Sequence, residues 1–255
     1  MKKKQIIATP TKPNYRSTYL VNYFTCPKKY ILSTEHKIET NDVMRDGLLF
    51  EGYVFDRFKE NNEDELIGRK KPATIEAIKT KADYVRKLFV KGEPFVKLNY
   101  SCEDYTITGE ADYIGNVVVN GEQVRCIADL KFTGNLKIWD DKLSEMKKEN
   151  FIQAYLYPYL WYQMKEEILP FVYIIVENTF ETPLIKIIRF NPSFQDFGYI
   201  VDVVEKVNAD NVYVANQGYG TCVNGKWGRC DMLQYCQEGR EFIAEPVEMD
   251  LSFLS

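Results

Sequence analysis

Two aspartates and one lysine near the middle of the chain have the types and spacing that metal-dependent hydrolysis requires. Asp112 ends the string Gly109-Glu110-Ala111-Asp112, and Asp129 precedes Lys131 by two residues. Side chains two positions apart on a strand point to the same face, so Asp129 and Lys131 are expected to lie together. Burying an aspartate in such an apolar strand is costly unless it is paired or bound to a metal. A structural Asp–Lys pair at a sheet edge is the alternative interpretation.

Glu51 adds a third carboxylate from an expected helix over residues 42–60. It occupies a core-facing step of that helix, where a hydrophobic residue is the usual choice. Gly47, one turn earlier, is expected to allow close approach of another backbone. The stripe on this face comprises Met44, Leu48, Glu51, Phe55 and Phe58. Alone, Glu51 would also fit a solvated edge position, but with the two aspartates it completes an oxygen-only site suited to Mg²⁺ or Mn²⁺.

These residue types suit the hydrolysis of a phosphodiester. The reaction needs a water made nucleophilic and neutralisation of the negative charge that develops at phosphorus. One or two divalent ions held by carboxylates supply both. Lys131 would orient the attacking water or stabilise the transition state as a fixed positive charge.

A glutamine and a tyrosine follow on the next expected helix. Gln153 and Tyr157 stand at i and i+4, so they share one face of a helix over about 144–166, which contains Pro158. The alternative is an aromatic helix that only packs, because Tyr155, Tyr159, Trp161 and Tyr162 surround them.

The elements that must position these residues change type along the chain. Helices are expected over 17–33 (interrupted near Cys26-Pro27), 42–60 and 73–90. The pattern then becomes strand-like, with turn chemistry at Asn120-Gly121. Strands are expected over 95–100, 104–109, 111–119, 123–131, 170–177 and 184–190, with a last helix at roughly 193–208 before a glycine- and cysteine-rich tail. Helices, then a sheet, then a helix and returning strands suit an α/β protein.

Composition narrows the function classes without choosing one. The net charge is −4, so nucleic-acid binding would require a local basic surface. Candidates are Lys2 to Lys4, Lys28-Lys29, Arg69-Lys70-Lys71 and Lys147-Lys148, each of which also fits a solvated face. His36 is the only histidine, which disfavours chemistry built on histidine bases or ligands. No membrane-length apolar stretch and no signal-peptide pattern is present, so a cytoplasmic location is expected.

The order of an acid, an acid-x-lysine strand and a Gln-x-x-x-Tyr helix resembles the PD-(D/E)XK nuclease superfamily, in particular its RecB/AddB-type and phage-exonuclease branch. The resemblance covers about residues 45–160. It departs where Ala111 replaces the proline of the family pattern. It implies that Asp112 and Asp129 are metal ligands, that Lys131 is the signature lysine, and that Glu51 is the acid of the first helix. Gln153 and Tyr157 match the motif that contacts DNA near the metal.

The resemblance also implies a fold and an activity. The expected fold is α/β, with a restriction-endonuclease-like core in which helices flank a central mixed sheet. A single nuclease domain over 1–255 would comprise an N-terminal helical part (1–92), a catalytic core (93–208) and a cysteine-bearing tail (209–255). The expected activity is a Mg²⁺- or Mn²⁺-dependent DNA exonuclease of recombination, replication or repair.

The compact build resembles a phage-encoded enzyme working in a bacterial host cell. DNA is then the partner, and a recombination or single-strand-annealing protein is a further one. The alternatives are a structure-selective or defence endonuclease on the same core, a non-catalytic DNA-binding or scaffolding protein, and a metal-clipped interaction module.

Four of the six cysteines resemble a cluster site of the same branch. In such nucleases, one cysteine before the core and three after it hold a 4Fe–4S cluster. Cys26, Cys222, Cys230 and Cys236 match this order, but seven residues separate Cys222 from Cys230 where the family commonly has two. A four-cysteine zinc site and uncoordinated reduced thiols are the other interpretations. Cys102 and Cys126 fall in expected strands and are interpreted as buried small hydrophobes.

Overall fold

The computed structural model describes residues 12–36, 40–59, 63–145, 147–179, 182–210, 213–216, 222 and 230–244. The chain divides into two compact units. One contains residues 1–17 and 42–202, and the other contains residues 18–41 and 203–255. The boundaries fall within the first helix, α1 (Ser17–Thr25), and within α8 (Phe194–Ala209). The expected organisation as one nuclease domain stays a prediction.

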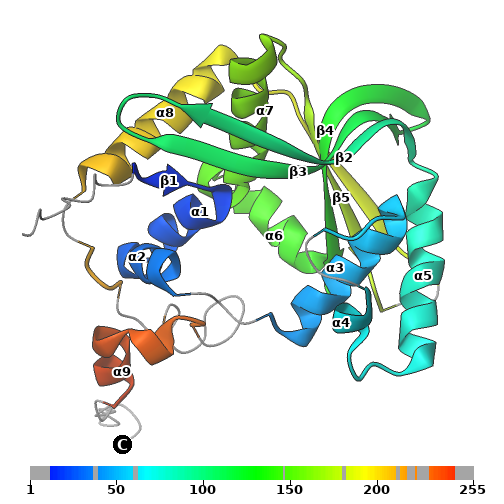
Figure 1. The fold of residues 1–255 in the computed structure, drawn as a ribbon, viewed down its shortest axis with the longest axis horizontal. Coiled ribbons are helices and arrows are strands. Elements are labelled where there is room, and N and C mark those ends of the chain that lie inside the picture. The colour runs from blue at the N-terminus through cyan, green and yellow to red at the C-terminus, as the bar shows by residue number, and fades with distance from the viewer. Residues whose placement is uncertain are drawn as a thin grey trace, which may run out of the picture. The chain divides into compact units, whose positions relative to one another are not determined.

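The first unit is built on a six-stranded mixed sheet (Figure 1). The central strand β3 (Thr106–Val119) pairs antiparallel with β2 (Phe89–Ser101) and with β4 (Glu122–Thr133), and parallel with the short β1 (Asn14–Tyr15). β4 pairs parallel with β5 (Phe171–Glu177), which pairs antiparallel with β6 (Ile185–Phe190). Asn120 and Gly121, with φ of 52° and 84°, form the expected two-residue turn between β3 and β4.

Helices cover both faces of this sheet. On one face, α3 (Asp42–Phe55) and α5 (Pro72–Arg86) pack with β3, β4 and β5 in the main hydrophobic core. On the opposite face lies α7 (Ile152–Lys165), which contacts β2, β3 and β5. The short helices α4 (Glu63–Ile67), α6 (Lys137–Glu145) and the 3-10 turn η1 (Lys148–Phe151) complete the unit. Two-sided coverage explains why β5 is apolar and buried over six of its seven residues.

The second unit is small and helical. The helix after α1, α2 (Pro27–Glu35), begins directly after Cys26, which has extended backbone at the N-cap position, and Pro27 takes the first helical position. The 3-10 turn η3 (Leu233–Tyr235) and α9 (Gln237–Ala244) come from the far end of the chain. A small apolar cluster is formed by Leu32, Met232 and Cys236, with Ile31, Ala215 and Cys230 packed around it.

The fold class is confirmed as α/β with a mixed central sheet flanked by helices. Four details of the expected elements were wrong. The expected strands 104–109 and 111–119 form one strand, β3, because Glu110 continues the pairing with β2 through Lys97. The expected helix 144–166 begins at Ile152, after a separate α6 and a 3-10 turn, and it continues through Pro158. The helix expected over 42–60 ends at Phe55, and the one expected over 73–90 ends at Arg86.

None of the helices in the described part of the chain combines the length and the apolar character that crossing a membrane would require.

Candidate active site

The predicted acidic residues meet where β3 and β4 separate. Their pairing ends at Tyr113 and Ala128, so Asp112 has no backbone partner on β4. Its carboxylate compensates, because Asp112 Oδ2 accepts the backbone N–H of Leu130 at 2.8 Å. The backbone of β4 therefore fixes the carboxylate of Asp112, a candidate metal ligand. Asp112 is buried, with an exposed fraction of 8%.

The neighbouring strand is distorted at the same level. Pro94 pairs with Tyr113 and Val96 with Ala111, so Phe95 stands opposite Asp112. Phe95 has a left-handed φ of 57°, which is costly for a bulky residue and occurs mainly where surrounding structure enforces it. Its ring lies beside the acidic site, with the centroid 4.9 Å from Lys59 Nζ.

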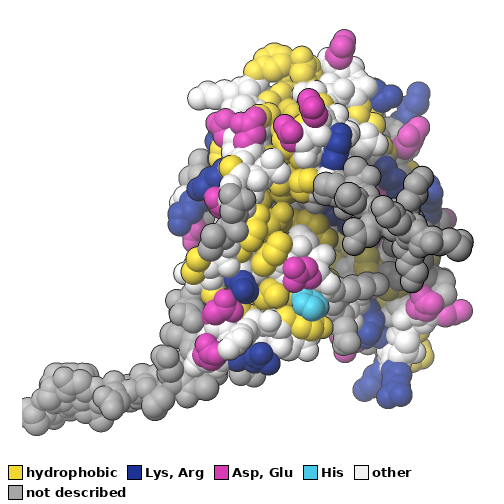
Figure 2. All heavy atoms as spheres, turned by 60° about the vertical axis from the view of Figure 1, so that its left-hand side comes forward, with side chains coloured by type: hydrophobic (Ala, Val, Ile, Leu, Met, Phe, Trp, Pro, Cys, Tyr) yellow, Lys and Arg dark blue, Asp and Glu magenta, His cyan; other side chains and the backbone are white. Residues whose placement is uncertain are grey.

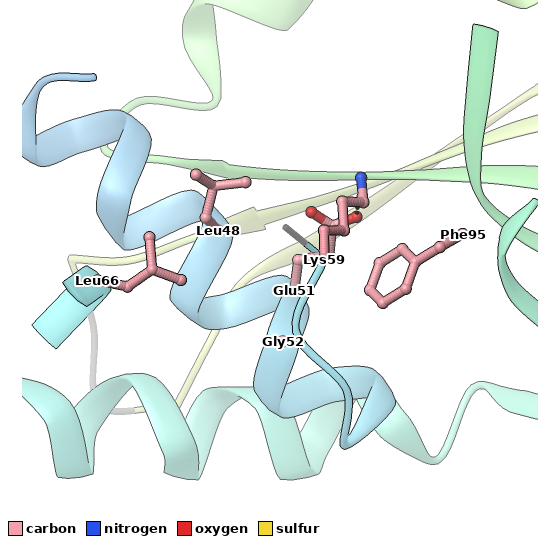
Figure 3. A pocket seen from close by; sticks show the side chains of 6 residues that line it. All are labelled: Leu48, Glu51, Gly52, Lys59, Leu66 and Phe95. Carbon is pink, nitrogen blue, oxygen red and sulfur yellow. Dashed lines mark ion pairs between the residues drawn. The ribbon is translucent and has the colours of Figure 1, made fainter. Parts of the chain in front are cut away.

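Lys59 places its ammonium among three carboxylates. Lys59 Nζ lies 2.7 Å from Glu51 Oε1, 3.0 Å from Asp112 Oδ1 and 3.4 Å from Glu110 Oε1. Figure 3 shows Glu51 on α3 with Lys59 directly beside it and the Phe95 ring next to them, and all three line a small pocket. The chain returns to Glu51 after the helix ends because the Phe58 ring packs directly on Gly52, where a side chain would collide with it.

Asp129 is the most deeply buried acid, with an exposed fraction of 1%. Asp129 Oδ1 accepts a hydrogen bond from Gln153 Nε2, and Asp129 Oδ2 pairs with the Lys131 ammonium. Cys126, Ala128 and Leu130 belong to the core on the other face of β4, as their alternation predicts. Asp129 and Lys131 therefore face α7, and Gln153 connects that helix to the site.

Tyr157 packs next to the site without a direct bond to the acids. Its ring meets Phe171, with centroids 6.1 Å apart, and it lies against Gly109 of the Gly-Glu-Ala-Asp string. A Cβ at position 109 would be 2.6 Å from Tyr157 Cε1, which real contacts do not show. The absence of a side chain at Gly109 thus sets how closely α7 approaches β3.

Burial and neighbouring charges shift the pKa values of the three acids by different amounts. The pKa of Glu51 is raised to about 9, mainly by burial. The nearby Asp112 carboxylate also raises this pKa, and its effect is larger than the opposing effect of Lys59. Burial also raises the pKa of Asp129 to about 7, although Lys131 opposes the rise. Burial acts in the same direction on Asp112, but Lys59 and Lys131 outweigh it and hold its pKa below the ordinary value. Without a further cation, the cluster therefore keeps one acid protonated.

The donors fit a hard divalent cation in type. Glu51 Oε1 and Asp129 Oδ2 are buried, and each faces a lysine ammonium, that of Lys59 for Glu51 and that of Lys131 for Asp129. Each oxygen therefore already faces a cation, and carboxylate oxygens are the donors that Mg²⁺ and Mn²⁺ prefer. In the described part of the chain, however, no three His, Cys, Asp or Glu side chains are grouped as ready metal ligands. Lys59 stands at the point that Glu51, Glu110 and Asp112 share, so a metal there requires Lys59 to move.

The structure therefore gathers Glu51, Asp112, Asp129, Lys131 and Gln153 at one place, with Tyr157 beside them. Sequence reasoning missed Lys59 and Glu110, since neither belongs to the acid-x-lysine pattern. The role expected for Gly47 was wrong, because nothing lies within 4 Å of a Cβ built there. Met44 is 46% exposed, so the buried face of α3 is carried instead by Leu49, Phe50, Tyr53 and Val54.

The four cluster candidates among the cysteines all lie in the second unit. Cys26, Cys222 and Cys236 are buried and Cys230 is half-buried. Two sulfurs accept backbone N–H groups at 3.3 Å, Cys26 Sγ from Asn216 and Cys236 Sγ from Gly239. Burial raises the pKa of Cys230 and of Cys236, and the neighbouring Cys26 thiol adds to both shifts.

The other two cysteines lie in the first unit. Burial raises the pKa of Cys126 to about 12, as expected for an inert core thiol. Cys102 differs from expectation, because it follows β2 in a turn and is only half-buried.

The basic clusters proposed from the sequence are largely neutralised. Lys28 pairs with Glu238, Lys29 with Asp231 and Lys70 with Asp46. Lys148 pairs with Asp196 at 2.8 Å. The cluster at residues 2–4 lies outside the described residues. On the face drawn in Figure 2, Lys and Arg side chains are scattered among Asp and Glu side chains.

Comparison with known proteins identifies the fold. No protein-family model and no curated protein matches the sequence. Among solved structures, the chain is similar to a protein from Eubacterium rectale named "putative exonuclease", with a TM-score of 0.55 and 13% identity, covering 100% of this chain and 97% of that one. A second structure, SSO0001, gives a TM-score of 0.42 at 14% identity over 79% of this chain and 78% of that one, which is too distant to support an argument. The first match shows a shared fold and leaves the activity to be argued from the site.

Proposed function

We propose that the chain is a divalent-metal-dependent DNA nuclease of the PD-(D/E)XK type. One observation carries the proposal. Glu51, Asp112 and Asp129 are buried beside the half-buried Lys131 at the point where two central strands separate, although they come from a helix and two strands. Burying three acids costs free energy, so such a group is expected where a function needs it. The full-length fold match to a protein named as an exonuclease supports the same class.

The proposed metal is Mg²⁺ or Mn²⁺, held by Glu51, Asp112 and Asp129. When bound, such an ion activates water and neutralises charge at phosphorus. The protein's own residues prepare the site. Asp112 is oriented by the Leu130 N–H, and Asp129 is oriented by Gln153. The half-buried Lys131 keeps its charge, because Asp129 and Asp112 raise its pKa above the ordinary value against the effect of desolvation.

Lys59 and Lys131 have different parts in this proposal. Lys131 is fixed on β4 and contributes positive charge toward the reacting phosphate. Lys59 lies on the chain after α3 and balances the acids before a metal arrives. Displaced from the carboxylates, the Lys59 ammonium becomes available to a DNA phosphate. Glu51 must lose a proton when the metal binds, which the raised pKa makes dependent on pH.

The finer assignment is an exonuclease acting on DNA in recombination, replication or repair. It is supported by the residue order and by the name of the structural match. A single-strand-annealing or other recombination protein is the expected partner. An endonuclease on the same core is separated from an exonuclease by substrate topology, since only an endonuclease cuts covalently closed circles.

The four-cysteine site is proposed as a structural metal centre, either a 4Fe–4S cluster or zinc. The N–H groups donated to Cys26 Sγ and Cys236 Sγ support thiolate ligation, because such bonds stabilise negative sulfur. Protein purified without oxygen should be brown if it holds the cluster, and metal analysis would show stoichiometric zinc in the other case. Protein with no metal would leave the residues as ordinary thiols.

The deciding experiment compares end-labelled linear, nicked and covalently closed circular DNA, in single- and double-stranded form. Each is incubated with Mg²⁺, with Mn²⁺ or with EDTA. An exonuclease releases mononucleotides or short products from linear DNA and leaves closed circles intact. Glu122→Gln, an exposed change in the β3–β4 turn, is the matched control for changes at the buried acids. Degradation that continues in EDTA, or that survives Asp129→Asn, would contradict the proposal.

A further inference from the structure

A second pocket of the first unit lies beside the start of α7 and the end of β6. Its volume is about 410 Å³, within the range of pockets that bind small organic ligands and too large for a single ion. Three aromatic side chains form its walls, Phe151, Tyr155 and Phe190, and Lys147 and Arg189 lie at its rim. None of these residues belongs to the acid site. We refer to these five residues as the aromatic pocket.

The rings of the aromatic pocket are held in place by one another. The Phe151 and Phe190 centroids are 5.1 Å apart, and the Tyr155 and Phe190 centroids are 5.9 Å apart at an interplanar angle of 74°. Phe151 is buried, whereas Tyr155 and Phe190 are half-buried and therefore expose part of each ring. Ordered, partly exposed rings offer a surface on which a flat ligand can stack with little loss of side-chain entropy.

The charge of the lining favours an anionic ligand. Arg189 Nε donates to Asn191 Oδ1 at 3.0 Å, and Arg189 forms no ion pair with any described residue. Lys147 Nζ forms an ion pair with the exposed Glu145 Oε2, at 4.0 Å, and with no other described residue. The carboxylate in the lining, Asp196, is already neutralised by Lys148 at 2.8 Å and by the Ser193 N–H and hydroxyl. Two cationic side chains thus stand beside an apolar, aromatic interior.

One shared ring separates the aromatic pocket from the catalytic lysine. The Tyr173 centroid lies 6.3 Å from that of Phe151, 6.0 Å from that of Phe190 and 6.0 Å from Lys131 Nζ. Tyr173 is also the register partner of Asp129 across the β4–β5 ladder. Two successive contacts, ring to ring and ring to ammonium, thus connect the lining of the pocket to Lys131.

We infer that the aromatic pocket binds the base of an unpaired nucleotide next to the phosphate that is cleaved, with Arg189 and Lys147 contacting the flanking phosphates. This rests on the proposed nuclease function and adds the kind of strand that it accepts. A base can stack on protein rings only after it leaves the stack of its own duplex. The site therefore favours single-stranded DNA or frayed ends over an intact duplex.

The test measures binding separately from cleavage. Fluorescence anisotropy with a 5′-fluorescein oligothymidylate in EDTA reports affinity for a single strand when no metal supports cutting. Tyr155→Leu should weaken binding by about tenfold, within the range found for removing one stacking ring. Tyr84→Leu, at an exposed tyrosine of α5, is the matched control and should bind as the wild type does.

Two further arms make the result specific. On an oligonucleotide of the same length with abasic residues, Tyr155→Leu and the wild type should bind equally, because no base remains to stack. Arg189→Gln, a change at an exposed side chain, should weaken binding to both oligonucleotides and reduce its salt dependence. Arg125→Gln, on exposed β4 sequence, is its control.

The outcomes separate a failure of the aromatic pocket from a failure of the proposed nuclease function. Protein that cleaves DNA but binds the oligonucleotide equally well with and without Tyr155 and Arg189 overturns the aromatic pocket and leaves the proposed function standing. Equal loss on thymidylate and abasic strands for Tyr155→Leu also overturns base stacking. Protein that neither binds nor cleaves DNA overturns the proposed function and the pocket together.

Discussion

The acid site and the cysteine site differ in how the charge of their buried candidate ligands is handled. The acids lie on long strands and a helix, and two lysine ammonium groups balance their charge. The cysteines lie on short segments from both ends of the chain, around a small apolar cluster. Buried thiols stay neutral because burial raises their pKa, so they need no counter-ion. The acid site can therefore form without a metal. The cysteine site is held by its apolar contacts, by two N–H bonds to sulfur and by the ion pairs of Lys28 and Lys29.

The largest effect is expected from breaking the acid site. Asp129→Ala and Lys131→Ala should each reduce DNA cleavage by at least about 10²–10³-fold, the usual result of removing a charged group that stabilises the transition state. Initial rates on linear DNA measure the loss. Clustered carboxylates alone suggest that removing Asp129 relieves repulsion. Loss of the carboxylate that pairs with Lys131 would oppose this relief in the apo protein. A cleavage rate equal to that of the wild type in either variant would exclude the assigned site.

Cys236→Ala should disrupt the cysteine site. It removes a proposed ligand and an apolar contact, so any bound metal should fall to near zero and the tail should become sensitive to protease. Metal analysis and limited proteolysis follow the two effects. Cys102→Ala, which changes a half-buried thiol of the first unit, should alter neither. Unchanged metal content in Cys236→Ala would remove this residue from the ligand set.

Lys59→Met tests whether an ammonium takes the place of the metal. Hydrogen bonds to charged groups are worth about 1.5–3 kcal/mol, so removing this competitor should tighten Mn²⁺ binding by roughly tenfold. The same variant should be less stable than the wild type in EDTA, because the acids lose their counter-charge. Calorimetric titration and urea unfolding give the two readouts, and Lys79→Met on α5 is the control. Weaker Mn²⁺ binding in Lys59→Met would show that Lys59 assists the metal instead.

Gln153→Ala should have an intermediate effect. Gln153 donates to Asp129 and so orients a ligand without being one itself. Loss of such an orienting bond usually costs about tenfold in activity or metal affinity. The split between Mn²⁺ affinity and oligonucleotide affinity shows whether the side chain also touches DNA. A variant that matches the wild type in both would leave this helix face with a packing role.

The last prediction concerns pH. The pKa of Glu51 is raised from 4.5 to about 9 in the folded protein, mainly by burial. Between these values the folded state holds a proton that the unfolded state has lost, so stability in EDTA should fall as the pH rises from 6 to 9. Glu51→Gln imitates the protonated form and should flatten that slope, whereas Glu122→Gln should retain it. Urea unfolding at several pH values measures both, and a wild-type stability that rises over this interval would contradict the shift.

Much of the first unit was predictable from local pattern. Alternation on β4 placed Asp129 and Lys131 on one face and Cys126, Ala128 and Leu130 on the other, and Asn120-Gly121 marked the turn. These features depend on neighbours within a few residues. The i, i+4 spacing likewise placed Gln153 and Tyr157 on one helix face toward the sheet.

Lys59 could not be found in the same way. Its position depends on where α3 ends, on the contact between Phe58 and Gly52, and on the left-handed Phe95 opposite Asp112. Each of these features depends on tertiary structure and leaves no periodic pattern in the sequence. The one available hint was a lysine eight residues after a core-facing acid. The aromatic pocket was missed for a similar reason, since its residues come from η1, α7 and β6 and meet only in the fold.

The hydrogen bond from the Leu130 N–H to Asp112 makes the geometry of the acid site depend on the register between β3 and β4. A slip of one residue between β3 and β4 would turn alternate side chains to the other face and leave Asp112 without that N–H. A molecule that folded in the wrong register would then lack a working acid site. For a protein proposed to cut DNA, misfolded copies would then be inert rather than indiscriminate.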